Sequence, residues 1–254
     1  MPNVARFSIT PVKGTSLQHP SEVHIEEGGV AENRRFFLID ADGVLFTAAK
    51  APQLMQIQAD YVSEEEQLSL AFPDGTVAEG SATAVGDGVD VDFWGRPTPG
   101  LVLEGAWTLA LSGFVGQPVR LVRAEEPGGG RDVGALTLMS TASVEELSRR
   151  AGLDDADGRR FRMLIELGGC EPHEEDTWGG RLLRMGESVI RIGLPVPRCL
   201  VVNKDPDTGD RSLNALRVIA QYRERSADNQ LVFGVYGEVE EPGLVRVGDP
   251  AELL

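Results

Sequence analysis

Cysteine is scarce in this sequence, with only Cys170 and Cys199 among 254 residues. Two cysteines in a chain of this length do not form a disulfide-stabilised scaffold, and neither belongs to a Cys-x-x-Cys pair or a Cys/His spacing typical of structural zinc. This usage fits a reducing compartment, so we predict a cytoplasmic protein.

Long apolar runs are also missing. No stretch approaches the ~18 residues that cross a bilayer as a helix. Residues 1–20 lack the basic segment followed by an apolar core that marks a secretory leader. The sequence therefore predicts no membrane partner.

Basic residues are outnumbered, since 24 Lys and Arg stand against 40 Asp and Glu and give a formal net charge of −16. Proteins bind a nucleic-acid backbone by neutralising its phosphates with Lys and Arg, so this class of partner is disfavoured. Lysine occurs only at Lys13, Lys50 and Lys204. Any local anion site is therefore expected to use guanidinium groups, although the base composition of the genome explains the same bias equally well.

Short segments rich in β-forming residues, separated by Gly, Pro and Asp turn signals, make up most of the chain. This pattern predicts a mainly β fold with a few helices (α+β), curled into a sheet or barrel. Strands are expected at residues 4–10, 21–27, 32–39, 44–47, 54–61, 67–72, 89–93, 117–123, 135–139, 159–165, 189–192, 199–203, 232–239 and 244–247. Helices are expected at residues 104–116, from a capping box at Ser143 and Glu146 to Gly152, and around residues 213–222.

The stretch around Cys199 is the first candidate site. Pro195 and Pro197 favour extended backbone, and the apolar run at residues 200–202 suggests a strand, so Cys199 is expected where an irregular segment enters a sheet. A thiolate is a soft-metal ligand and a nucleophile, and Arg198 would favour the ionised form. From residue types alone, inert packing of a lone cysteine on an apolar strand is the more common outcome.

Basic residues gather at three further places. Lys13 follows the first expected strand and is surrounded by Gly14, Thr15 and Ser16, an arrangement that can present an ammonium and amides to an oxyanion and that also occurs in ordinary exposed turns. Arg34 stands at the start of a hairpin. The sequence Arg159-Arg160-Phe161-Arg162 suggests an anion site, and partners for the acidic surface would explain it equally well.

Taken together, ten short matches in order make the chain resemble the MOSC-domain family, in the amidoxime-reducing and hydroxylaminopurine-reducing group that carries an N-terminal β-barrel domain. The matches are Pro11-Val12-Lys13, Asn33-Arg34 with residues 40–43, Phe46-Thr47 with Pro52, residues 114–121, Phe161-Arg162, residues 175–178, Arg198-Cys199, residues 205–209, Phe233-Gly234 and residues 247–249. The resemblance implies an N-terminal β-barrel-like domain at residues 1–104 packed on a MOSC β-barrel domain at residues 105–254.

This resemblance also implies a molybdenum cofactor (molybdopterin), with Cys199 as the metal ligand and catalytic cysteine. Lys13 and Arg34 are then expected to contact the pterin and its phosphate, and Arg162 and Arg198 to make further cofactor contacts. The sequence departs from the family's pattern at Gly14, Ala49, Val196 and Leu164. Thr15, Ser16 or Lys50 are expected to replace polar groups lost at Ala49 and Leu164.

The implied activity is the two-electron reduction of a small N-hydroxylated substrate, such as an amidoxime, a hydroxylamine or an N-hydroxylated base. The electrons would come from an external reductase or a ferredoxin-like protein. Two alternatives stay open: a non-catalytic carrier of sulfur or molybdenum cofactor that uses Cys199, and a degenerate barrel that binds another small ligand without metal.

Overall fold

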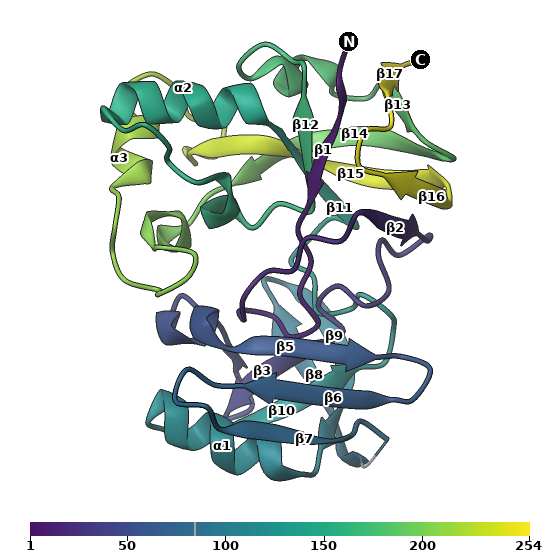
Figure 1. Ribbon diagram of the computed structural model, residues 1–254, viewed down its shortest axis with the longest axis vertical. Helices are drawn as coiled ribbons and strands as arrows, with labels where there is room; N and C mark the ends of the chain where they lie inside the picture. Colours follow the sequence, from purple (N-terminus) through teal and green to yellow (C-terminus); the bar gives the residue numbers. More distant parts are fainter. Residues whose placement is uncertain (84) are drawn as a thin grey trace.

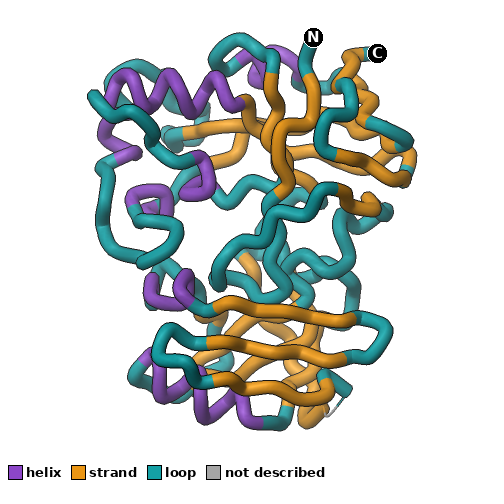
Figure 2. The backbone as a smooth tube through the Cα atoms, viewed as in Figure 1, coloured by secondary structure: helices purple, strands orange, loops and turns teal. Residues whose placement is uncertain are grey.

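The computed structural model describes residues 1–83 and 85–254, and within them the protein is mainly β with three α-helices (Figure 1). Two groups of strands lie one above the other, and the N and C termini lie close together at one end. The tube in Figure 2 shows how strands dominate both groups and how loops fill the region between them. The predicted class, mainly β with barrel-like sheets, is confirmed.

The upper group in Figure 1 is a seven-stranded sheet. Its order is β1 (Asn3–Phe7), β12 (Ile165–Gly168), β11 (Leu136–Ser140), β15 (Val232–Glu241), β14 (Ser188–Pro197), β13 (Leu182–Met185) and β17 (Ala251–Leu253). Among the described residues of this sheet, β11 and β12 form the one parallel pair of strands. Its apolar side chains form one core around Phe7, Leu138 and Trp178, all at most 2% exposed.

Two smaller sheets form the lower group. One has the order β4 (Leu45–Phe46), β3 (Phe36–Asp40), β10 (Val119–Ala124), β9 (Arg96–Leu103) and β8 (Val85–Phe93), and the other joins β5 (Gln58–Val62), β6 (Gln67–Ala71) and β7 (Val77–Ser81). Helix α1 (Ala106–Val115) covers one side, and the Trp107 indole donates to the carbonyl of Leu68 at 3.3 Å. A second apolar core fills this group.

The chain exchanges elements between the two groups. Strand β1 belongs to the upper sheet, and β2 (Glu22–Ile25) pairs with β16 (Gly243–Arg246) near the other end of the sequence. Helix α1 and strand β10 follow residue 104 and pack on the lower group. The expected boundary between residues 104 and 105 stays a prediction.

Helix α2 (Thr141–Ala151) begins earlier than the capping box predicts. Ser140 is its N-cap, because the Ser140 side chain accepts from the Ser143 amide at 3.1 Å. Gly152 ends the helix with φ of 70°, as expected. The helix predicted around residues 213–222 is present but shorter, because α3 spans only Ala215–Ile219.

Two predicted strands are wrong. Residues 200–203 form the 3₁₀ helix η4 (Leu200–Asn203), in which Leu200 is exposed while Val202 is buried, so the apolar run does not alternate across a sheet. Residues 158–161 form η2 (Gly158–Phe161), and the strand begins only at Ile165. Similarly, residues 52–56 form η1 (Pro52–Gln56) ahead of β5.

In the part of the chain that the structure describes, no helix is both long enough and apolar enough to cross a membrane.

Candidate functional site

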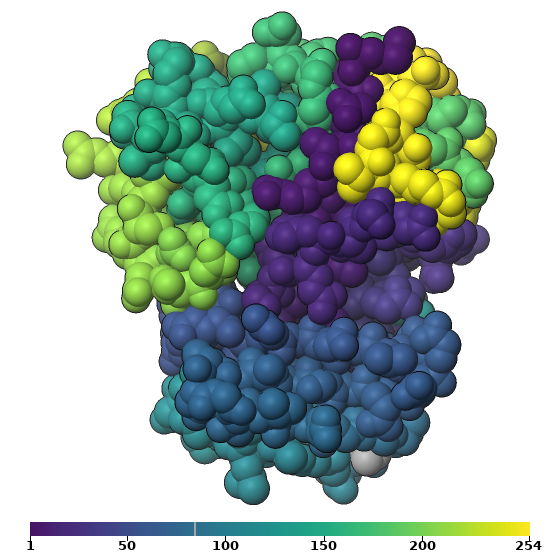
Figure 3. Space-filling view, in the orientation of Figure 1, coloured from purple at the N-terminus to yellow at the C-terminus, as the bar shows by residue number. Residues whose placement is uncertain are grey.

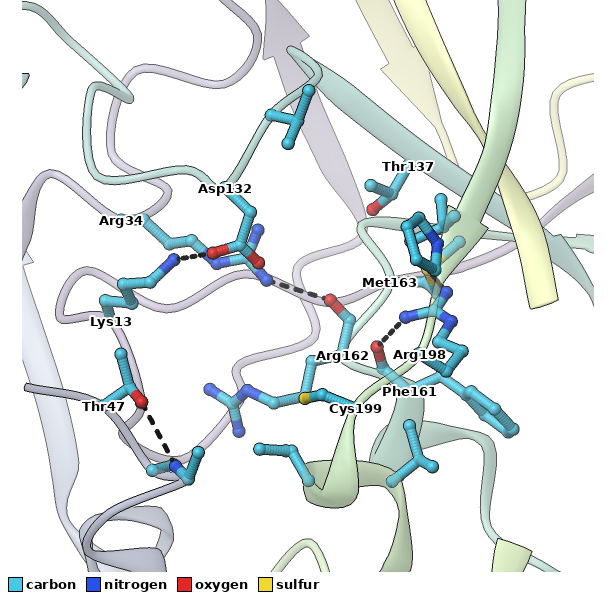
Figure 4. A pocket seen from close by; sticks show the side chains of 18 of the residues that line it. Lys13, Arg34, Thr47, Asp132, Thr137, Phe161, Arg162, Met163, Arg198 and Cys199 are labelled. Atoms are coloured by element: carbon cyan, nitrogen blue, oxygen red, sulfur yellow. Dashed lines mark hydrogen bonds and ion pairs between the residues drawn. The ribbon is translucent and has the colours of Figure 1, made fainter. Parts of the chain in front are cut away.

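A cavity of about 180 Å³ lies between the two strand groups (Figure 4). Its lower wall comes from Lys13, Arg34, residues 47–49 and Trp94. Its upper wall comes from residues 132–134, 160–163, 196–199 and 201–202, with Thr137 and Tyr236. Five of the six predicted site residues line it: Lys13, Arg34, Arg162, Arg198 and Cys199. Segments far apart in the sequence therefore build one pocket.

Lys13 reaches the pocket from the loop after β1. Its amide donates to the carbonyl of Phe36 at 2.8 Å, which fixes the loop against β3. Its ammonium donates to the Gly130 carbonyl at 3.0 Å and pairs with the carboxylate of Asp132. Burial lowers the pKa of Lys13 to about 8, because Asp132 only partly offsets the loss of solvent.

Arg34 has a left-handed backbone, with φ of 57°. Its amide donates to Thr10 O at 2.6 Å, and its guanidinium donates to Arg162 O at 3.0 Å, so it links the two walls. The backbone of Gly130 approaches closely here, and a Cβ at that position would lie 2.4 Å from Arg34 O. Only glycine fits there without a shift of the backbone.

Arg162 also has a left-handed backbone, at the end of η2, with φ of 53°. Its Nη2 donates to Thr15 O at 2.6 Å, while its buried Nη1 has no partner among residues 1–83 and 85–254. Burial, and then the nearby Arg34, lower the pKa of Arg162 to about 9. Unbalanced positive charge and an orphaned donor are both features that a bound anion would satisfy.

Thr15, the sixth predicted residue, lies behind the pocket wall. It is fully buried, and its hydroxyl bonds to Thr10 Oγ1 at 2.7 Å and to Val12 O at 2.8 Å. Its carbonyl, not its side chain, reaches the site by accepting from Arg162.

Arg198 holds the segment that carries Cys199. Its Nε and Nη2 donate to Phe233 O at 2.9 and 2.6 Å, and its Nη1 donates to Phe161 O at 3.1 Å. Burial lowers the pKa of Arg198 to about 10. All three guanidinium nitrogens are thus engaged with the protein, so Arg198 fixes the backbone on both sides of the pocket.

Cys199 follows the end of β14 and precedes η4, and its side chain is exposed at the pocket. Cys199 lies in an irregular segment, as predicted, but the residues after it form the 3₁₀ helix η4 and not the predicted strand. Within residues 1–83 and 85–254 no three His, Cys, Asp or Glu side chains cluster as a metal site. A metal at Cys199 would therefore have to bring its other ligands with it. Cys170 lies half-buried against the upper core, and burial raises its pKa to about 12.

The positions that depart from the family's pattern differ in their relation to the pocket. Ala49 and Val196 line it with apolar groups, whereas Leu164 is 2% exposed in the upper core. Lys50 is bound to Asp40 at 3.1 Å. It therefore does not replace the polar group lost at Ala49.

Sequence reasoning missed Asp132 and Trp94. Asp132 follows the Gly-rich stretch predicted as flexible loop, where Gly128 and Gly130 donate to the carbonyls of Ala31 and Arg34 at 3.0 Å each. Burial opposes ionisation of Asp132, but Lys13 and Arg34 outweigh it and lower its pKa. The only sequence signal was an acid two residues after three consecutive glycines, Gly128–Gly130. Trp94 occupies a hairpin turn, where its ring lies 5.4 Å from the Lys13 ammonium.

Fold and site define a two-part, mainly β protein with an arginine-rich pocket and an accessible cysteine between the parts. The chain belongs to the MOSC-domain family. The family model for the MOSC domain matches residues 126–252, and the model for the MOSC N-terminal beta barrel domain matches residues 1–118. The resemblance inferred from the ten motifs is confirmed.

Named relatives are similar over nearly the whole chain. Mitochondrial amidoxime-reducing component 1 of Mus musculus is 27% identical over 99% of this chain and 82% of its own length. Mitochondrial amidoxime reducing component 2 of Macaca fascicularis is 28% identical over 97% and 82%. The crystal structure of the YUAD protein from Bacillus subtilis matches with a TM-score of 0.50 and 10% identity, covering 100% of this chain and 96% of that one, which shows similarity of fold alone.

Proposed function

We propose that the protein is a molybdenum-cofactor-dependent reductase of small N-hydroxylated compounds. The observation that carries this proposal is the charge of the pocket: five cationic side chains line it with a single carboxylate, Asp132, beside an exposed cysteine. A phosphorylated, metal-binding cofactor supplies both missing partners, an anion for the guanidinium groups and a soft metal for the thiolate. The residues present therefore fit the cofactor that the family resemblance implies.

Each side chain has a distinct task in this proposal. Lys13, Arg34 and Arg162 bind the phosphate end, with the free Nη1 of Arg162 as the unoccupied donor. Cys199 provides the thiolate for the metal. Arg198 acts by positioning, because its nitrogens already hold the carbonyls of Phe161 and Phe233. The bound cofactor would supply the two-electron redox chemistry, which the protein's own side chains do not.

The proposed substrate class comes from the relatives that are named as amidoxime-reducing components. Reduction of an N-hydroxylated group takes two electrons and two protons and releases water. The electrons must come from outside the chain.

Metal analysis tests the proposal directly. Protein purified from a host that makes the cofactor is expected to contain near-stoichiometric molybdenum and pterin, and Cys199→Ala is expected to lose the metal. Cys170→Ala is the matched control and should retain it. Loaded wild-type protein should then reduce an aryl amidoxime with a chemically reduced viologen dye.

Absence of molybdenum from wild-type protein made in a cofactor-replete host would contradict the proposal. Sulfur on Cys199, detected as a persulfide by mass spectrometry, would then support the carrier function. If neither molybdenum nor sulfur is found, the remaining candidate function is a barrel that binds another small ligand.

A further inference from the structure

A second concave surface lies on the other side of the segment that leads into Cys199. It is an open groove of about 440 Å³, lined by Pro197, Arg198, Leu216, Arg217, Ala220, Arg225, Gln230 and Leu231. Pro197 and Arg198 also line the cation-rich pocket, so this segment is a wall common to both. The groove and the pocket are therefore separated by little more than one strand end.

The charge of this groove is opposite to that of the protein as a whole. Three of its eight described lining residues are arginines and none is acidic, whereas the chain carries a net charge of −16. Arg217, on α3, and Arg225 are both exposed. An acidic partner would be repelled by most of this protein and attracted here, which orients its approach.

Apolar side chains are exposed on the same segment. Leu194 in β14 is 78% exposed and Leu200 in η4 is 68% exposed, and Cys199 lies between them in the sequence. Pro197 and Arg198, which line the groove, lie between these two leucines in the sequence. Exposed large apolar residues together with arginines are a composition found in protein interfaces, where apolar contact supplies affinity and the charged rim supplies orientation. In Figure 3 the yellow-green surface of the segment after η4 stands out on one side of the molecule, where a partner could reach it.

We propose that this arginine groove, with Leu194 and Leu200, is the docking surface for an acidic one-electron carrier protein that supplies the pocket with electrons. The proposal rests on the proposed function. Each N–O bond cleaved takes two electrons and two protons and yields the reduced nitrogen compound and one water, so two reduced carriers are each oxidised by one electron per turnover. The carrier does not enter the pocket, since only the segment from Pro197 to Cys199 separates it from the metal site.

The test uses the molybdenum-loaded full chain, an aryl amidoxime and two alternative electron sources. One is a reduced [2Fe–2S] ferredoxin, an acidic protein, and the other is a reduced viologen dye that needs no docking surface. Arg217→Glu, alone and combined with Arg225→Glu, is compared with Arg184→Glu. Arg184 is an exposed arginine on β13, at the opposite side of the upper sheet from α3 in Figure 1.

Charge reversal in the groove should lower kcat/KM for ferredoxin about tenfold and flatten its dependence on ionic strength. The rate with viologen should stay within about twofold, and Arg184→Glu should leave both rates unchanged. Calorimetric titration of oxidised ferredoxin, which needs no turnover, should rank the affinities in the same order.

Three results would overturn the docking surface. An unchanged ferredoxin rate and affinity in the double variant would place the contact elsewhere. An equal loss with both electron sources would assign the groove to an anionic substrate or to folding. A wild-type enzyme that is active with viologen but accepts nothing from ferredoxin would exclude an acidic carrier of this kind. If loaded wild-type protein is inactive even with viologen, the proposed function fails instead, and the titration alone decides the docking surface.

Discussion

Two clusters of buried and partly buried polar side chains differ in how their charge is balanced. The pocket cluster is Lys13, Arg34, Arg162 and Arg198 with Asp132, and cations outnumber the carboxylate. The α2 cluster, packed near α2, is His173, Glu175, Asp176, Tyr222 and Arg223, in which Arg223 bonds Asp176 at 2.6 Å and burial raises the pKa of Glu175.

Both clusters contain buried polar atoms without a partner in the described part of the chain, including Arg162 Nη1 in the first and Glu175 Oε2 in the second. Orphaned atoms alone therefore do not identify a ligand site. An excess of one charge in an open cavity is a better indicator of a ligand site. A bound ligand of opposite charge can balance the charge that the protein leaves uncompensated.

The same substitution in both clusters should have opposite effects. Arg162→Met removes a cation whose charge the protein leaves largely unbalanced, so we expect anion binding to weaken about tenfold to a hundredfold. The free energy of unfolding should change little, since repulsion from Arg34 is also removed. Arg223→Met leaves Asp176 buried without its partner and should cost about 3 kcal/mol of stability.

Isothermal titration with phenyl phosphate and urea unfolding measure the two effects. Equal destabilisation by both variants, with unchanged phosphate binding, would make the pocket cluster as structural as the α2 cluster.

The α2 cluster should reveal itself through acid sensitivity. Burial lowers the pKa of His173 from 6.5 to about 4, so the unfolded chain binds more protons between these values and stability falls as pH decreases through them. The loss is complete below pH 4, the pH at which folded and unfolded chains are both protonated at His173. His173→Asn should flatten this slope, and asparagine tolerates the left-handed backbone, with φ of 61°.

Urea midpoints at a series of pH values provide the measurement for this prediction. A slope that survives in the asparagine variant would assign the acid sensitivity to other groups.

Lys13 makes anion binding by the pocket cluster weaken as the pH rises, whereas the stability that depends on the α2 cluster falls as the pH decreases. Its pKa of about 8 means that its charge is lost above that pH, so anion affinity should fall about tenfold for each further pH unit. Phenyl phosphate stays doubly charged across this range. Lys13→Met should bind weakly, with a profile that is flat through pH 8 and falls only near the pKa of about 9 of Arg162. A slope centred on pH 8 in that variant would contradict the assignment to Lys13.

Much of the fold was predictable because polar and apolar residues alternate along its strands, or because turn signals mark the ends of the strands. The hairpin around residues 40–43 and helix α1 are examples, and both are confirmed. The prediction of a strand at Leu200–Val202 failed because these residues form a 3₁₀ turn in which Leu200 is exposed while Val202 and Asn203 are buried. Strand β9 was missed because Pro97, Pro99 and Gly100 imitate a loop.

The site was predictable only in part. Lys13, Arg34, Arg162 and Cys199 were found through the family's motifs, and no local pattern would have joined them, since they lie on four separate segments. Asp132 and the arginine groove depend on how the loops fold back, which residue spacing does not encode. The role of Arg198 became clear only from the carbonyls that it holds.

The exchange of strands between the two groups has a consequence for synthesis on the ribosome. Strand β2 (Glu22–Ile25) is synthesised long before its partner, Gly243–Arg246, because the two lie far apart in the sequence. Strand β1 likewise waits for Ile165–Gly168. Such long-range pairing is slow to form, so the two walls of the pocket are fully joined only after the chain has been made through Arg246. A ligand that touches both walls must therefore be inserted after that point in synthesis.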